Sequence, residues 1–377
     1  MRPMSSSQLT RAEHHQSISS SVAGPSPNAG YSLDAPEAMK MSGWERLAVD
    51  DWKQREHIDD SKQIRLVRLS HMRYMHPDLN TITQFLLDFG MHIAKKTDDT
   101  VWMRGYGSEP YVYVAEKGPE KKYLGGAWTV ESYEELEKAT KLPNASPIEE
   151  LTSSPGGGHR LTFLDPEGFP VNLIFGQIPA ETGKLPQKLI YNFEKEKSRQ
   201  GAFQRFQTGP AAVHKLGHYG LCVSDLPAQV QFYTRNFNFV PSDFLRVPDE
   251  SAPGGMRDVG FFAHVDRGEE FVDHHSFFMS SASTAHVHHA SFEVHDFDTQ
   301  LLGHQWLAAK NYKSVWGVGR HILGSQIFDY WWDTTGFMIE HYTDGDTVNN
   351  KTPIGLGPAG SESLSVWGPE LPLDFLD

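Results

Sequence analysis

An internal repeat is the feature that most constrains how this chain can fold. Residues 69–71 (Leu-Ser-His) match residues 216–218 (Leu-Gly-His), and residues 165–169 (Asp-Pro-Glu-Gly-Phe) match residues 333–337 (Asp-Thr-Thr-Gly-Phe). The order of strand, helix and further strands predicted around the first segments recurs around the second. Such self-similarity indicates related structural units. We therefore predict an α+β fold of two modules of about 120–130 residues, each containing two strand-helix-strand units.

Hydrophobic periodicity and turn residues give the expected elements of each module. In the first half, strands are predicted at 64–74, 111–115, 125–130, 160–164 and 169–175, and helices at 78–89 and 132–140. In the second half, strands are predicted at 215–223, 260–265, 275–279, 287–294, 325–332 and 337–342, and helices at 225–236 and 298–310.

Composition changes at both ends of the chain and between the modules. The N-terminal region is rich in Ser, Pro and charge, which predicts disorder because little apolar surface can be buried. The middle segment is polar and is expected to be a strap with a short helix, and the C-terminal segment is rich in Gly and Pro. The resulting division is an arm at 1–60, a first module at 61–178, a linker at 179–211, a second module at 212–345 and an irregular tail at 346–377.

Charge and cysteine content exclude several classes of partner. The formal net charge is −14 and no basic cluster is present, which argues against nucleic acid and anionic membranes. No apolar run approaches the roughly 20 residues that span a bilayer. The single cysteine, Cys222, provides no disulfide framework and favours a reducing, cytoplasmic location. The sequence leaves homo-oligomerisation open.

The predicted chemistry lies in the second module, because twelve of the 19 histidines follow residue 211. Residues 216–223 overlay residues 287–294, which makes His289 the counterpart of His218. Glu340 comes from the last predicted strand. Two imidazoles and one carboxylate on one face suit non-haem Fe(II) and leave positions open for further ligands, although the same set accepts Mn(II).

The second module resembles the type I extradiol ring-cleaving dioxygenases of the vicinal oxygen chelate superfamily, which also contains glyoxalases and bleomycin-resistance proteins. The resemblance covers about residues 64–345. It rests on His321 after Gly-Arg, on Tyr330 nine residues later and Glu340 ten further, and on the histidine-containing segments 216–218, 274–278 and 288–292. It implies two tandem modules of repeated βαβββ units, each an incomplete β-barrel around a cavity.

The resemblance also implies roles for individual residues. It assigns His218, His289 and Glu340 as the Fe(II) ligands. It assigns His275 as the acid/base, with His274 as the alternative if the strand register shifts by one residue. Tyr330 and His321 would donate hydrogen bonds to the bound substrate and oxygen.

Three further expectations concern the neighbours of these residues. His288 is expected to face away from the cavity. The first module is expected to lack a metal, because Asn172 replaces Glu340 and Gly125 or Gly126 replaces His289, although His71 is kept. An aromatic cavity wall is predicted from Phe261, Phe262, Phe277, Phe328, Trp331 and Trp332.

The predicted function is therefore an Fe(II)-dependent extradiol dioxygenase that cleaves a catechol-type ring with O₂ (meta cleavage). Its partners would be a small aromatic diol and O₂. Two alternatives use the same fold: a metal-dependent, glyoxalase-like lyase or isomerase, and a metal-free module that binds an aromatic ligand. The sequence does not identify the ring substituents, nor does it separate a catabolic from a biosynthetic pathway.

Overall fold

The computed structural model describes residues 44–360, 364–373 and 375. Most of the predicted N-terminal arm lies outside these residues. Its predicted end is wrong, because Glu45–Leu47 forms strand β1 and Val49–Arg55 forms helix α2. Trp52 on α2 is only 1% exposed. The average composition of the first 60 residues concealed this short segment, whose large apolar side chains can be buried.

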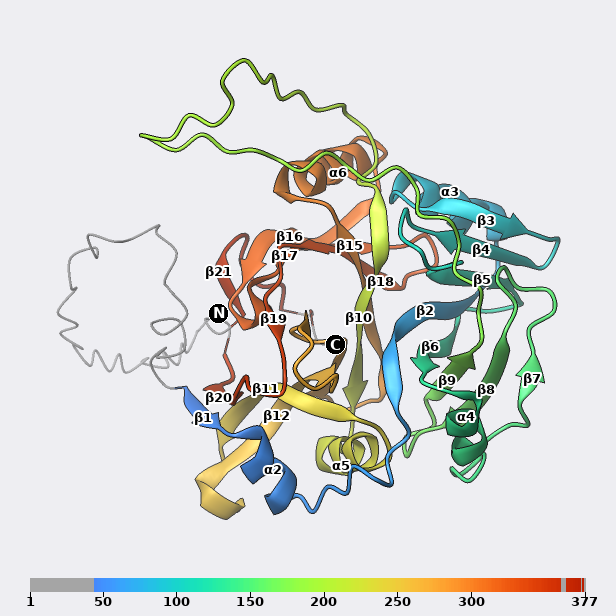
Figure 1. The fold of residues 1–377 in the computed structure, drawn as a ribbon, viewed down its shortest axis with the longest axis vertical. Helices are drawn as coiled ribbons and strands as arrows, with labels where there is room; N and C mark the ends of the chain where they lie inside the picture. The colour runs from blue at the N-terminus through green and yellow to red at the C-terminus, as the bar shows by residue number, and fades with distance from the viewer. Residues whose placement is uncertain (1–43, 361–363, 374, 376–377) are drawn as a thin grey trace, which may run out of the picture. The chain divides into compact units, whose positions relative to one another are not determined.

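The first sheet has eight strands and lies within residues 66–175, which Figure 1 draws from blue to green. Its strands follow the order β3-β4-β5-β2-β6-β9-β8-β7. They are β2 (Leu66–His76), β3 (His92–Lys96), β4 (Thr100–Arg104), β5 (Tyr113–Lys117), β6 (Lys122–Val130), β7 (Glu149–Glu150), β8 (His159–Leu164) and β9 (Pro170–Phe175). Helices α3 (Leu79–Asp88) and α4 (Tyr133–Ala139) each follow the first strand of a unit.

The second sheet has eleven strands in the order β1-β20-β11-β12-β14-β10-β15-β18-β17-β16-β21, in which β20 is Ile354–Pro358 and β21 is Ser365–Trp367. Its module strands are β10 (Val213–Val223), β11 (Phe239–Pro248), β12 (Met256–Val265), β14 (Phe277–Ser281), β15 (His286–Val294), β16 (Lys313–His321), β17 (Ile327–Trp332) and β18 (Met338–Thr343). Helices α5 (Leu226–Asn236) and α6 (Phe297–Ala309) follow β10 and β15. A small ribbon pairs β13 (Val272–Asp273) with β19 (Thr347–Val348).

Strand pairing confirms the predicted α+β fold of repeated βαβββ units. In the first sheet β2 is parallel to β5 and antiparallel to β6, and β6 is parallel to β9. In the second sheet β10 has the same relations to β14 and β15, and β15 to β18. The strands that sequence analysis missed include β3, which is mostly exposed, and β11, which contains two prolines. Neither shows the alternation that signals a half-buried strand.

The regions outside the modules differ from prediction. The linker 179–211 contains no helix, only an isolated bridge between Asn192 and Lys197, and it runs as an extended loop near α6 (Figure 1). The tail is not irregular throughout, because β20 (Ile354–Pro358) and β21 (Ser365–Trp367) join the second sheet. Among the described residues, no helix is long and apolar enough to cross a membrane.

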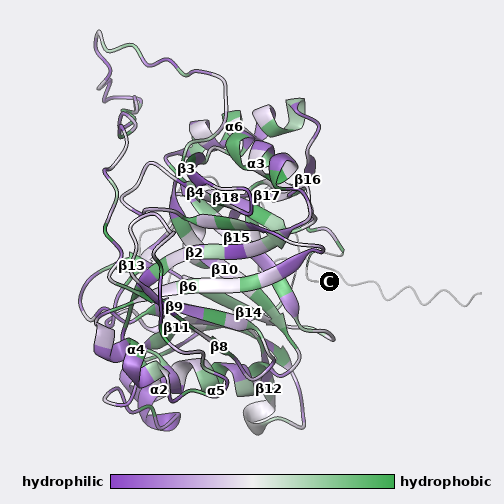
Figure 2. Ribbon diagram, turned by 90° about the vertical axis from the view of Figure 1, so that its right-hand side faces the viewer, coloured by the Kyte–Doolittle hydropathy of each residue, from purple (hydrophilic) through white to green (hydrophobic). Residues whose placement is uncertain are grey.

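The hydrophobic core is continuous between the two sheets. Trp128 of β6 contacts Tyr219 of β10 and Phe277 of β14, with ring centroids 5.8 and 6.3 Å apart. The strands carry both hydrophobic and hydrophilic residues (Figure 2), and strands such as β17 and β18 are buried at nearly every position. The modules therefore stabilise each other through apolar packing as well as through hydrogen bonds.

Matching turns confirm the repeat in atomic detail. The Asp165 carboxylate accepts hydrogen bonds from the backbone N–H groups of Glu167 and Phe169, at 3.0 and 2.9 Å. Asp333 accepts from Thr335 and Phe337, at 2.8 and 2.9 Å. Each aspartate thus fixes the turn that leads into the last strand of its module.

The turn at Asp333 predicts a pH-dependent contribution to stability. Burial raises the pKa of Asp333 from 3.8 to about 6. The folded state therefore binds this proton more tightly than the unfolded state, and the associated stability is present below about pH 4 and is lost as the pH rises through about 6. Relative to Asp333→Asn, the wild-type free energy of unfolding should fall by about 3 kcal/mol between pH 4 and 7 in urea titrations. A pH-independent difference would contradict this assignment.

Asn238, which is 1% exposed, links the two modules. Its Oδ1 accepts from the Leu66 N–H at 2.6 Å, and its Nδ2 donates to the carbonyls of Leu66 and Asp266 at 3.1 and 3.0 Å. A single buried amide therefore satisfies the backbone at the start of β2 and the end of β12.

Asn238→Ala should lower the free energy of unfolding by about 2–4 kcal/mol, because it leaves the buried backbone groups of Leu66 without partners. Urea denaturation measures this loss. Asn350→Ala is the control: its side chain is exposed, and the change should be within about 0.5 kcal/mol. Equal effects of the two substitutions would show that Asn238 does not hold the modules together.

Candidate metal centre

Three ligand-type side chains converge from three adjacent strands. His218 lies on β10, His289 on β15 and Glu340 on β18, and Ser291 on the middle strand lies opposite both His218 and Glu340. The two Nε2 atoms are 3.1 Å apart, and Glu340 Oε2 lies 3.2 Å from His218 Nε2 and 3.6 Å from His289 Nε2. Within the described part of the chain, this is the one group of three or more His, Cys, Asp or Glu residues close enough to share a metal ion.

The chemistry of this cluster fits a divalent cation. Glu340 is 0% exposed, and neither carboxylate oxygen has a hydrogen-bond partner among the residues described. Burial and the neighbouring imidazoles hold the pKa of His289 well below 6.5, so its ring is neutral, the form that binds metals. A carboxylate buried in this interior needs a compensating charge, which a divalent cation would supply.

The structure places the three predicted second-sphere residues around this cluster. The ring of His275 is 4.3 Å from that of His218. His321 Nε2 lies 3.0 Å from the Tyr330 hydroxyl, and Tyr330 pairs across the sheet with Glu340. Burial raises the pKa of Tyr330 well above 10, so the phenol keeps its proton at neutral pH and can donate it in a hydrogen bond.

His275 and His274 occupy different environments. The predicted strand at 275–279 begins instead at Phe277, so both histidines lie just before β14. His275 lines the cavity, whereas His274 turns away and places its Nε2 2.7 Å from Asp243 Oδ2. The arrangement favours His275 over His274 as the acid/base candidate.

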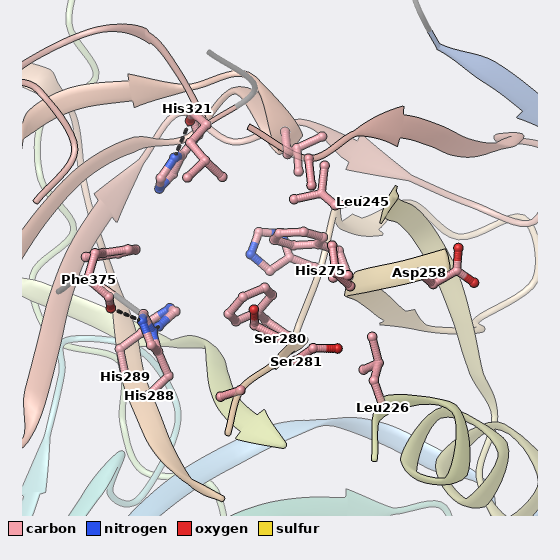
Figure 3. A pocket seen from close by; sticks show the side chains of 18 of the residues that line it. Leu226, Leu245, Asp258, His275, Ser280, Ser281, His288, His289, His321 and Phe375 are labelled. Atoms are coloured by element: carbon pink, nitrogen blue, oxygen red, sulfur yellow. Dashed lines mark hydrogen bonds between the residues drawn. The ribbon is translucent and has the colours of Figure 1, made fainter. Parts of the chain in front are cut away.

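A cavity of about 760 Å³ opens beside the cluster and is lined by His218, His275, His289, His321 and Tyr330. Figure 3 shows His275, His289 and His321 around it. Its aromatic wall differs from the predicted one. Only Phe262 of the six predicted aromatics lines it, together with Phe278, Trp316 and Phe375. Successive strand residues face opposite sides, so an error of one residue exchanged Phe278 for Phe277, which is buried in the core.

Sequence analysis missed two components of this cavity. His288 does not face away: it is 4% exposed, lines the cavity and places its Nε2 2.6 Å from the backbone carbonyl of Phe375. The tail also covers the cavity, because Leu364 and Phe375 line it and the Leu364 carbonyl accepts a hydrogen bond from His321 Nδ1 at 2.8 Å. The apolar residues that lie among the glycines and prolines of the tail could have indicated that this segment packs against the module.

In the first module, Asn172 occupies the position equivalent to Glu340, and its side-chain amide makes hydrogen bonds through both its oxygen and its nitrogen. Asn172 Oδ1 accepts from Arg73 Nη1 and Thr162 Oγ1 at 2.9 and 2.8 Å. Its Nδ2 donates to the carbonyls of Leu124 and Gly126. With its oxygen and its amide hydrogens engaged, Asn172 has no free group directed at a ligand.

Comparison with known proteins agrees with this site. Residues 215–341 match the family described as the glyoxalase/bleomycin resistance protein/dioxygenase superfamily. The matched residues span most of the second module. The chain is 27% identical to metapyrocatechase 2 of Cupriavidus necator over 323 residues, covering 82% of the chain and 91% of the relative. It is 24% identical to 3-methylcatechol 2,3-dioxygenase of Pseudomonas putida over 309 residues, covering 80% and 96%.

Solved structures show the same fold. Homoprotocatechuate 2,3-dioxygenase from Arthrobacter globiformis aligns with a TM-score of 0.68 at 18% identity, covering 84% of this chain and 92% of that one. An Mn(II)-bound glyoxalase from Novosphingobium aromaticivorans aligns with a TM-score of 0.64 at 19% identity, covering 82% and 95%. The predicted resemblance to extradiol dioxygenases is confirmed.

The metal cluster generates a test that needs no substrate. The wild-type chain should bind one divalent ion, and an ion at 100 times its Kd should stabilise the fold by about 3 kcal/mol. Glu340→Gln should weaken binding by more than the roughly 10–100-fold that loss of a supporting residue costs. Calorimetric titration with Fe(II) or Mn(II) measures the binding, and urea denaturation with and without the ion measures the stabilisation. His92→Ala, exposed on β3, is the control.

Without metal, the order of stability should reverse. Glu340→Gln removes an uncompensated buried charge, so the metal-free variant should be at least as stable as the metal-free wild type. A less stable metal-free variant would mean that the protein itself compensates the carboxylate.

Proposed function

We propose that this chain is an Fe(II)-dependent extradiol dioxygenase, with His218, His289 and Glu340 as the metal ligands. The observation that carries the proposal is the convergence of these three ligand atoms at one side of a cavity, with His275, His321 and Tyr330 around it. A metal ion held by these residues would supply Lewis-acid chemistry and open positions for a catechol and O₂. The two curated relatives are named for reactions of this class.

In this proposal, His275 acts as the acid/base. Its neutral imidazole takes a proton from a catechol hydroxyl, and the resulting cation later returns that proton to the ring-opened product. The buried position of His275, which is 4% exposed, keeps bulk water from exchanging the proton during this interval.

Tyr330 and His321 form the orienting pair. The phenol hydroxyl and the imidazole Nε2 are 3.0 Å apart, and the backbone carbonyl of Leu364 fixes the other side of the His321 ring. Because both rings are held by packing and hydrogen bonds, they can orient a substrate oxygen without first rearranging.

We further propose that the substrate is a small catechol with an apolar substituent. Phe262, Phe278, Trp316 and Phe375 form an apolar wall, while the charged side chains of Asp225, Arg257 and Asp258 line other parts of the cavity. The first module is proposed to carry no metal, because the side-chain oxygen and nitrogen of Asn172 are already engaged in hydrogen bonds. Fe(II) rather than Mn(II), the predicted cytoplasmic location and the oligomeric state stay predictions.

Two other functions share this fold. A glyoxalase-like lyase or isomerase would need a second carboxylate ligand, whereas Glu340 is the single carboxylate in the cluster. A metal-free binding module would gain nothing from an unpaired buried carboxylate, which is costly to keep.

The test is oxygen uptake. The protein is reconstituted anaerobically with Fe(II), mixed with catechol, 3-methylcatechol and other catechols, and exposed to air. We expect O₂ uptake matched by the visible absorbance of a ring-opened product, lost in Glu340→Ala and His218→Ala but kept in His92→Ala. Tight metal binding without uptake on any catechol would favour the lyase or isomerase, and absence of metal binding would favour the binding module.

A further inference from the structure

A buried acid–imidazole pair lies directly behind the proposed acid/base. Asp243 of β11 is 4% exposed and His274 is 7% exposed. His274 Nε2 lies 2.7 Å from Asp243 Oδ2, and His274 Nδ1 lies 3.1 Å from His275 Nδ1. These contacts form one chain of three side chains that ends at the cavity.

We propose that Asp243 and His274 are positioning residues that fix the tautomer of His275 and accept its displaced proton. This inference rests on the proposed function, in which His275 is the acid/base. It adds two residues for which sequence analysis gave no such role: Asp243 was not singled out, and His274 was considered only as a substitute for His275.

Counting the hydrogens between Asp243, His274 and His275 gives the tautomer of His275. A carboxylate can only accept, so the proton between Asp243 and His274 belongs to His274 Nε2. A neutral imidazole carries one N–H, so His274 Nδ1 is an acceptor and His275 Nδ1 must donate to it. His275 therefore keeps its Nε2 lone pair free, which is the form that a general base requires.

The surroundings preserve this order of donors and acceptors. Arg46 Nη1 lies 3.9 Å from Asp243 Oδ1, so the two carboxylate oxygens face different partners. The Ser242 hydroxyl donates to the His274 backbone carbonyl and contacts His264 Nδ1 at 2.8 Å. Burial lowers the pKa of His264 to about 4, so this neighbour adds no charge at neutral pH.

Two glycines leave room for the pair. A Cβ at Gly355 of β20 would lie 1.9 Å from Asp243 Oδ1, and a Cβ at Gly324 would lie 2.9 Å from His274 Nδ1. Gly324 also has a φ of +64°, which favours glycine. Side chains at either position would displace the acid or the imidazole, so the packing here is specific to this arrangement.

The hydrogen-bonded side chains of Asp243, His274 and His275 also account for every proton in the transfer. When the substrate O–H bond breaks and a proton bonds to His275 Nε2, the proton on His275 Nδ1 can move to His274 Nδ1. The positive charge then lies on His274, where the carboxylate of Asp243 stabilises it, and reversal of both shifts returns the proton to the product. A buried aspartate that orients an imidazole and stabilises its cation works in this way in serine proteases.

Asp243→Asn is the sharpest variant, because it keeps the shape and reverses the hydrogen bonds. With the amide oxygen facing Arg46, the amide N–H donates to His274 Nε2. His274 then carries its proton on Nδ1 and donates to His275, whose Nε2 is left protonated. His274→Asn keeps an acceptor for His275 Nδ1, whereas His274→Leu removes it.

The first readout is structural and needs no substrate. Nitrogen–hydrogen correlation NMR of the full-length, ¹⁵N-histidine-labelled protein loaded with diamagnetic Zn(II) reports which ring nitrogen of His275 is protonated. We expect protonated Nδ1 in the wild type and protonated Nε2 in Asp243→Asn. Protonated Nε2 in the wild type, or the same tautomer in both proteins, would overturn the proposal.

The second readout is the split between kcat and KM on the best catechol. Asp243→Asn and His274→Leu should lower kcat at least about 10-fold with KM little changed, whereas His274→Asn should recover most of the loss. Asp51→Asn, exposed on α2, is the matched control. Unchanged kcat in both Asp243→Asn and His274→Leu would overturn the inference. If the wild type cleaves no catechol, the proposed function fails, and the NMR result alone decides this inference.

Discussion

The arrangement of the second module depends on three ligand-type side chains that point at one position inside an apolar interior. Glu340 and the two imidazoles are almost entirely buried, and the strands that carry them are central, paired strands of the sheet. The sheet supplies the stability that holds these groups in an unfavourable arrangement. A bound cation would convert that cost into an attraction shared by three strands.

The fold could be predicted from the sequence because the repeated residues include ones that fix local structure, such as turns. Asp165 and Asp333 mark the same turn, so the last strand of each module could be located from either copy. Several strands without such markers were missed. β3 exposes most of its residues, and β16 contains glycines that break the hydrophobic alternation, so neither left a periodic signal.

The candidate ligands could also be predicted from the repeat, but their surroundings could not. His218, His289 and Glu340 follow from overlaying strands, which is a local comparison. The contacts of His288 and His321 with the tail join residues that are distant in sequence. Such contacts involve backbone carbonyls, which every residue possesses, so no residue type in the sequence indicates them. The one-residue error in the aromatic wall has a related cause, because only the tertiary structure decides which face of β14 meets the cavity.

The way in which the tail contacts the cavity separates two kinds of change. Backbone carbonyls of Leu364, Pro369 and Phe375 hold His321, Trp316 and His288, whereas the side chains of Leu364 and Phe375 form part of the wall. Substitutions in the tail can therefore reshape the cavity while the hydrogen bonds to the imidazoles persist. In evolutionary terms, substrate range can drift through this segment without disturbing the hydrogen bonds that hold His288 and His321.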